Sequence, residues 1–281
     1  MTSDLRSVRL PDGSTVACLG QGTWRMGEHS ARRAQEIAAL RRGVELGLTL
    51  IDTAEMYGDG GAEELLAEAL RGLRDTVFLV SKAYPQHGAG PALRRACENS
   101  LRRLSTDRID LYLLHWRGDA PLAATVEGMT ALQREGKIRH WGVSNFDADD
   151  MEDLLEAGGD GAVTNQVLYN LTRRGPEFDL LPFMDKLSQP AMAYSPIEQG
   201  RLHGHETLEK VAGRHGAATG LQVALAWLLR RPDLMVILKA GSVAHVAENR
   251  AAVDLALTEA DLADLDQAFP APTRKVALEM L

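Results

Sequence analysis

The sequence is poor in the residues that build metal centres and disulfide frameworks. It contains only two cysteines in 281 residues, Cys18 and Cys97, and neither belongs to a CxxC pair. Two isolated cysteines supply neither a zinc site nor a set of disulfides. His203 and His205 could suggest a metal site, but two ligands without a third are a weak signal. We therefore expect no metal.

The sequence also lacks a basic excess and a long apolar run. Its formal net charge is −8, spread along the chain without a basic block, whereas nucleic-acid binding requires a basic patch. No apolar stretch reaches membrane-spanning length, and the opening residues MTSDLRSVRLPDG lack the apolar core of a signal peptide. We expect a cytoplasmic protein with neither nucleic-acid nor membrane partners.

No low-complexity segment or linker divides the chain. Apolar residues make up 45% of it and charged residues 25%, which is typical of globular proteins. A chain of 281 residues is also long enough to bury a sizeable core without disulfides or metal ions to stabilise it. We therefore predict a single domain over residues 1–281.

Short aliphatic runs recur along the chain after a predicted hairpin, for which Asp12 and Gly13 suit the tight turn. The expected strands cover residues 48–52, 77–81, 109–115, 141–145, 162–166, 191–195 and 234–238. Amphipathic helical stretches lie between them, one capped by Asp147 and another by Thr219. Such alternation of strands and helices indicates parallel pairing.

An eighth strand near residues 20–24 brings the count to that of a closed barrel. The alternative is a doubly wound open sheet, which usually carries a G-x-G-x-x-G motif. Gly20 and Gly22 lack the third glycine of that motif. We therefore predict an α/β protein with a single (β/α)8 TIM barrel, an N-terminal β-hairpin and an extra C-terminal helix at about residues 258–268.

Polar residues stand at or directly after the predicted strand ends. They are Asp52, Ser81, Lys82, His115, Ser144, Asn145, Asn165, Gln166, Tyr194, Ser195 and Lys239. In a (β/α)8 barrel the C-terminal strand ends meet at one mouth, where active sites are built. Each residue alone has an ordinary explanation, such as a loop aspartate or a surface lysine. Together with Tyr57, they predict a shared site.

Asp52, Tyr57, Lys82 and His115 suit acid catalysis. A phenol has a reference pKa of about 10, and a nearby ammonium favours its ionised form, so we expect Lys82 to lower the pKa of Tyr57. Asp52 would keep Lys82 charged, and His115 would orient a substrate carbonyl. Because this tetrad has no nucleophile and no metal, its chemistry needs an external reductant.

At these residues the sequence resembles the aldo-keto reductase superfamily, over almost its whole length. The matching segments are IDTAEMYG (51–58), VSK (80–82), DLYLLHW (110–116), GKIRHWGVSNF (136–146), NQVLYN (165–170) and AYSP (193–196), in the order of the family. Within the superfamily the chain is most similar to short bacterial enzymes of the methylglyoxal-reductase type.

The resemblance implies reduction of small aldehydes and ketones, methylglyoxal-like 2-oxoaldehydes among them, with NADPH, and leaves NADH open as a second cofactor. It implies that Tyr57 donates the proton, Asp52 and Lys82 tune it, and His115 orients the carbonyl. Trp24 and Trp116 would form the apolar wall of the substrate pocket. The implied cofactor-binding residues are Gly22, Thr23, Asp52, Ser144, Asn145, Gln166, Tyr194, Ser195, Pro196, Ile197, Lys239, Ala240, Ser242, His245, Glu248 and Asn249.

The segment 237–250 bears on the choice of cofactor. Lys239 follows a strand and Ser242 can cap a helix, which together suit an anion; by resemblance that anion is the adenosine 2′-phosphate. The sequence departs from the commoner family pattern at Ala240, where that pattern has Ser, and at His245, where it has Arg. An imidazole is neutral for much of the time at pH 7. We expect a narrow NADPH preference that grows at lower pH.

Two other functions stay open at this point. One is a cofactor-binding regulatory module with little turnover, and the other is a metal-dependent or Schiff-base barrel enzyme that uses Lys82. The connection after His115 and the segment 270–281 are both short, and in this family they build the specificity wall. We therefore expect an open, shallow pocket for small carbonyls, in a monomeric protein.

Overall fold

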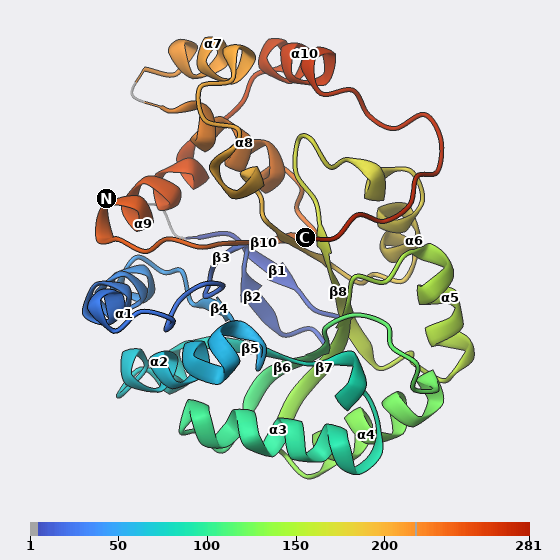
Figure 1. The fold of residues 1–281 in the computed structure, drawn as a ribbon. Helices are drawn as coiled ribbons and strands as arrows, with labels where there is room; N and C mark the ends of the chain where they lie inside the picture. The colour runs from blue at the N-terminus through green and yellow to red at the C-terminus, as the bar shows by residue number, and fades with distance from the viewer. Residues whose placement is uncertain (1–4, 217) are drawn as a thin grey trace.

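The computed structural model describes residues 5–216 and 218–281, and a closed barrel of eight parallel strands forms its centre (Figure 1). Its strands are β3 (Leu19–Gly22), β4 (Leu50–Asp52), β5 (Phe78–Ala83), β6 (Ile109–Leu114), β7 (Ile138–Ser144), β8 (Ala162–Leu168), β9 (Ala191–Tyr194) and β10 (Leu234–Leu238). They pair in chain order, and β10 closes the ring onto β3. The predicted barrel is confirmed, and the open sheet is excluded.

The predicted eighth strand is β3, which runs close to its neighbour β4. A Cβ at Gly20 would lie 2.6 Å from both Cγ and the carbonyl oxygen of Leu50, so this approach requires glycine. β3 pairs with β4 so that Gly22 lies opposite Asp52. Gly20 therefore permits close strand packing, and Gly22 lies beside Asp52 at the barrel mouth. Neither belongs to the phosphate-binding loop of an open sheet.

The predicted hairpin is also present, as β1 (Ser7–Arg9) and β2 (Thr15–Ala17), and it lies behind the ring of barrel strands in Figure 1. Gly13 takes the positive φ of 88° that the turn needs. Val8, Leu10 and Val16 are buried, so the hairpin covers the N-terminal end of the barrel with apolar side chains.

Helices surround the barrel (Figure 1). They are α1 (Ser30–Glu45), α2 (Gly61–Ala69), α3 (Gly90–Leu104), α4 (Leu122–Arg134), α5 (Ala148–Glu156), α6 (Leu180–Lys186), α7 (Glu206–Arg214), α8 (Gly220–Leu229), α9 (Val243–Ala251) and α10 (Glu259–Ala268). Asp147 and Thr219 cap α5 and α8 as predicted, each within a capping box. Such reciprocal caps satisfy backbone N–H groups that a helix start leaves unpaired.

The extra C-terminal helix is α10. It packs against α7 (Figure 1), and the sequence did not predict this contact. Asp261 joins the two helices. Its Oδ1 lies 2.7 Å from Nη1 of Arg214 and its Oδ2 lies 2.8 Å from Nε2 of His215. The pair α7 and α10 therefore forms a layer outside the barrel.

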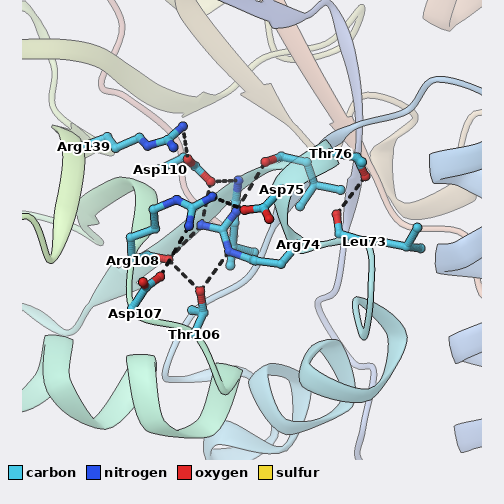
Figure 2. Close-up of polar contacts among 11 residues, drawn as sticks. Leu73, Arg74, Asp75, Thr76, Thr106, Asp107, Arg108, Asp110 and Arg139 are labelled. Atoms are coloured by element: carbon cyan, nitrogen blue, oxygen red, sulfur yellow. Dashed lines mark hydrogen bonds and ion pairs between the residues drawn. The ribbon is translucent and has the colours of Figure 1, made fainter.

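A polar cluster lies at the N-terminal ends of β5, β6 and β7, opposite the mouth (Figure 2). The Asp110 carboxylate, only 1% exposed, lies 2.8 Å from Nη2 of Arg74 and 3.0 Å from Nη1 of Arg139. It also accepts the backbone N–H of Leu79 at 3.0 Å. Residues at this end of a (β/α)8 barrel serve stability.

Both cysteines are buried and free. Burial raises the pKa of the Cys97 thiol to about 12, so it stays protonated. Within residues 5–216 and 218–281, no helix is both long enough and apolar enough to cross a membrane.

Candidate active site

A cavity of about 1030 Å³ opens where the C-terminal strand ends meet. The predicted residues that line it are Gly22, Trp24, Asp52, Tyr57, His115, Trp116, Ser144, Asn145, Gln166, Tyr194, Ser195, Pro196, Ile197, Lys239, His245, Glu248 and Asn249. The structure therefore gathers on one cavity residues that are spread from position 22 to position 249. Four other predicted residues, Thr23, Lys82, Ala240 and Ser242, are not among the residues that line it.

Lys82 is the buried centre of the tetrad. Its Nζ donates to Oδ2 of Asp52 at 2.7 Å, to the carbonyl oxygen of Thr53 at 2.8 Å and to Oη of Tyr57 at 3.2 Å. An ammonium has three N–H groups, so these contacts use all of them. Because Oη of Tyr57 accepts one, the phenol keeps its own O–H for a ligand in the cavity.

The electrostatics of Tyr57 differ from the expectation. Burial, and then the Asp52 carboxylate, raise the pKa of Tyr57 well above its usual value. Burial likewise lowers the pKa of Lys82, although Asp52 opposes that shift. The predicted lowering of the Tyr57 pKa by Lys82 is therefore wrong for this structure, because burial, and then the charge of Asp52, raise that pKa. The phenol stays protonated, as a proton donor must.

His115 is a neutral donor beside the phenol. Burial, and then the charge of Lys82, lower the pKa of His115 to about 2. Its ring centroid lies 5.9 Å from that of Tyr57, at an interplanar angle of 73°. Among the described residues, its buried Nδ1 has no hydrogen-bond partner. An orphaned buried N–H is rarer than an orphaned acceptor, so we assign the proton to Nε2.

Hydrogen bonds join the other polar strand ends to this tetrad. Gln166 donates from Nε2 to Oδ1 of Asp52 at 2.8 Å, a contact that the sequence analysis missed. Ser144 donates from Oγ to the carbonyl oxygen of Gln166 at 2.8 Å. Tyr194 donates from Oη to Oδ1 of Asn145 at 2.9 Å. The amides of Asn145 and Gln166 are thus held in place where they line the cavity.

Two mouth loops hold residues in strained backbone conformations. Asn145, after β7, has a φ of 59°, and Ser195, Glu198 and Gln199, after β9, have φ values of 51°, 49° and 56°. For residues other than glycine such conformations cost about 1–3 kcal/mol each and persist only where the surroundings enforce them. Their concentration beside the cavity marks these loops as built for a ligand.

The N-terminus of α9 forms the far end of the cavity. Ser242 caps the helix, with its Oγ accepting the backbone N–H of His245 at 3.3 Å. Lys239, His245 and Glu248 line the cavity there. Backbone N–H groups and a lysine at a helix start suit an anion. The residues therefore fit an elongated ligand with an anionic group at α9 and a planar ring near Tyr194.

The apolar wall near Tyr57 contains both predicted tryptophans. The ring centroid of Trp116 lies 5.0 Å from that of His115 and 6.1 Å from that of Tyr84. Cζ of Arg25 lies 4.3 Å from the ring centroid of Trp24. Lining residues that were not predicted as site residues are Arg25, Met56, Gln199, Gly200, His203, Thr219, Leu221, Ile237, Leu238, Met280 and Leu281. Arg25, Met56 and Leu238 are direct chain neighbours of predicted residues, which is the signal that could have found them.

The C-terminal segment supplies part of the cavity wall although it is short, and the open, shallow substrate pocket stays a prediction. After α10 the chain runs along the edge of the molecule and returns to the barrel mouth (Figure 1). Met280 and Leu281 consequently line the cavity. Even a short segment supplies a wall, because it folds back over the site.

His203 lines the cavity from the loop that follows β9, whereas His205 packs on Phe269, with 4.6 Å between ring centroids. Within the described part of the chain, no three His, Cys, Asp or Glu side chains are grouped so as to hold a metal ion.

Comparisons with known proteins agree with this geometry. The Aldo/keto reductase family model matches residues 18–269. Methylglyoxal reductase YeaE of Escherichia coli (strain K12) is 51% identical over 273 residues, 95% of this chain and 96% of the relative. An NADH-specific methylglyoxal reductase of the same organism is 29% identical, over 90% of this chain and 95% of its own length.

A crystal structure of an aldo-keto reductase from Klebsiella pneumoniae, in complex with NADPH, superimposes with a TM-score of 0.96. The two sequences are 53% identical, and the match covers 99% of this chain and 100% of the Klebsiella chain. The chain therefore belongs to the Aldo/keto reductase family of NAD(P)H-dependent oxidoreductases.

Proposed function

We propose that the protein reduces small aldehydes and ketones, including 2-oxoaldehydes such as methylglyoxal, to alcohols with NADPH. The observation that carries the proposal is the state of Tyr57: its Oη accepts from Lys82 at 3.2 Å, its pKa is raised by burial, and it lines the cavity. The phenol is thus a protonated donor beside a substrate-sized space. The names of the E. coli relatives support the substrate class.

In this reaction the bound nicotinamide supplies a hydride to the carbonyl carbon. Tyr57 gives its proton to the carbonyl oxygen, and Nζ of Lys82 stabilises the phenolate that remains. Asp52 holds Lys82 in position, and neutral His115 donates to the same carbonyl oxygen and aligns it. Trp24, Trp116 and the C-terminal segment exclude water, which strengthens these electrostatic interactions.

The cofactor would occupy the rest of the cavity. Ser144, Asn145 and Gln166 would contact the carboxamide, and Tyr194 would stack on the nicotinamide ring. The segment 195–197 would follow the pyrophosphate. Residues 239–249 would hold the adenosine end, with Lys239 at the 2′-phosphate. NADPH is the expected cofactor, and an NADH-specific relative keeps NADH as a second one.

The test is NADPH oxidation, followed by absorbance, with methylglyoxal and a panel of small aldehydes. Tyr57→Phe should lower kcat by about 10²- to 10⁴-fold, the contribution of a positioned general acid, and leave NADPH binding unchanged. Tyr112→Phe is the matched control, because this buried phenol does not line the cavity. NADPH binding without turnover of any carbonyl would instead indicate the regulatory module, and absence of binding would refute the proposed site.

Three further predictions from the sequence stay predictions: a single domain over residues 1–281, a monomer and a cytoplasmic location. Light scattering on the purified protein tests the second. Limited proteolysis tests the first, because a single domain yields no stable half.

A further inference from the structure

The loop after β9 is held by the buried carboxylate of Glu198, which is 5% exposed. Asn170 donates from Nδ2 to Oε2 of Glu198 at 2.8 Å and to the carbonyl oxygen of Ser195 at 2.8 Å. Arg173 donates from Nη2 to Oε1 of Glu198 at 3.0 Å. These contacts stabilise the left-handed residues of segment 195–200, and they all come from the loop after β8.

The same loop also holds the C-terminal segment. Nη1 of Arg173 contacts Oε1 of Glu279, directly before Met280, which lines the cavity. A Cβ at Gly175 would lie 2.9 Å from Cγ2 of Val276, so glycine permits the close packing of the segment here. The loop after β8 therefore lies between the C-terminal segment and segment 195–200.

We propose that Arg173 is a positioning residue that couples cofactor seating to closure of the C-terminal segment over the pocket. Its guanidinium bridges Glu198 in segment 195–200 and Glu279 in the C-terminal segment, and a planar fork holds two carboxylates in one fixed geometry. When segment 195–200 opens to release the cofactor, Glu279 loses its oriented partner. Such coupling is reciprocal: a closed C-terminal segment favours the bound cofactor, and a bound cofactor favours closure.

The first test measures NADPH dissociation from the purified protein by stopped-flow fluorescence. Glu279→Gln touches no proposed cofactor contact, yet it should speed dissociation about two- to fivefold, the effect of a partly exposed ion pair. Arg173→Gln should speed it about tenfold or more, because it leaves the buried Glu198 with only the more exposed and more distant guanidinium of Arg201. In the Arg173→Gln background, Glu279→Gln should add nothing. Additive effects of the two substitutions would overturn the proposal.

Two control variants each remove ion pairs of only one of the two segments that Arg173 bridges. Lys275→Gln removes the contacts of the C-terminal segment with Asp149 at 2.7 Å and Asp179 at 3.5 Å, but nothing that reaches segment 195–200. Arg201→Gln removes the more exposed partner of Glu198 at 3.4 Å, which has no contact with the C-terminal segment. Both should leave NADPH dissociation within about twofold of wild type. If Lys275→Gln acted as strongly as Glu279→Gln, cover by the segment, not Arg173, would control release.

A second readout needs no turnover. Hydrogen exchange in the cofactor-free protein should rise in both 195–200 and 276–281 for Arg173→Gln, but only in 276–281 for Glu279→Gln. NADPH should slow exchange in 276–281 of the wild type more than in Glu279→Gln. Unchanged exchange in 276–281 of Arg173→Gln would refute the coupling.

The inference rests on the proposed cofactor position along 195–197, and the two can fail separately. If the wild type does not bind NADPH, the proposed function fails. If NADPH binds and Tyr57→Phe abolishes turnover, but Glu279→Gln releases NADPH at the wild-type rate, only the coupling fails.

Discussion

Nζ of Lys82 lies 2.7 Å from Oδ2 of Asp52, and the two side chains are 0% and 3% exposed. Removing both charges from water carries a large desolvation penalty, which their attraction and further hydrogen bonds must offset. Nζ of Lys82 donates two further hydrogen bonds, to Thr53 and Tyr57, and Asp52 accepts one from Gln166. The pair is therefore held in a fixed geometry, and either partner alone would be an uncompensated buried charge.

Breaking this pair should separate stability from activity. Lys82→Met should lower the free energy of unfolding by about 3–5 kcal/mol, because Asp52 is left buried and unpaired. Lys82→Met/Asp52→Asn should recover most of that loss but none of the turnover, because no cation stabilises the Tyr57 phenolate. Urea unfolding and the NADPH assay measure both. A double variant as unstable as the single one would contradict this account.

His115 should make the protein sensitive to mild acid. In the unfolded chain an imidazole binds a proton below about pH 6.5, whereas the pKa of folded His115 is lowered to about 2. A lowered folded pKa gives stability that is complete above the unfolded pKa and is lost as the pH falls. The loss is at most about 1.4 kcal/mol per pH unit.

His115→Gln should therefore flatten the decline in unfolding free energy between about pH 6.5 and 4.5, as measured by urea titration. Equal slopes for variant and wild type would show that this imidazole is not buried neutral. In the same range kcat should show no loss from protonation of His115.

His245 should influence how strongly the protein prefers NADPH over NADH. It lines the adenosine end of the cavity with Lys239, where a cation attracts a 2′-phosphate. His245→Arg places a permanently charged guanidinium there and should raise the ratio of NADPH to NADH affinity by about two- to fivefold. Fluorescence titration with both cofactors measures the ratio. An unchanged ratio would show that this position does not contact the 2′-phosphate.

The cluster at the other end of the barrel should affect stability alone. Asp110→Asn removes the charge that Arg74 and Arg139 share (Figure 2), which should destabilise the fold by about 3–5 kcal/mol. Below the lowered Tm, kcat should match wild type, because Asp110 lies on β6 near its N-terminal end and His115 follows the C-terminal end. A lowered kcat in fully folded Asp110→Asn would contradict this separation.

The sequence predicted the barrel and the tetrad because both follow local rules. Aliphatic runs at regular intervals predict parallel strands, and parallel strands bring their polar ends to one mouth, so Asp52, Lys82 and His115 could be placed together without coordinates. The aldo-keto reductase resemblance then supplied the roles. The helix caps at Asp147 and Thr219 were predictable for the same reason, since a cap depends on residues three positions apart.

Other features depend on distances that a sequence does not contain. The pKa of Tyr57 is raised first by burial and then by the charge of Asp52, and the sequence indicated the charge but not the burial. Gln166 bonds Asp52 across 114 positions of the chain. Met280 is held at the cavity by contacts between single side chains, such as that of Arg173 with Glu279. No periodic pattern in the sequence predicts such contacts.

The hairpin β1–β2 has a consequence for the return of protons. In the described part of the chain, its apolar side chains cover the N-terminal end of the barrel, so water reaches Tyr57 from the mouth. In the proposed reaction, the Tyr57 phenolate regains a proton along the route by which the alcohol leaves. Reprotonation therefore follows product departure, and recovery of Tyr57 that is limited by opening of the mouth would show little solvent isotope effect.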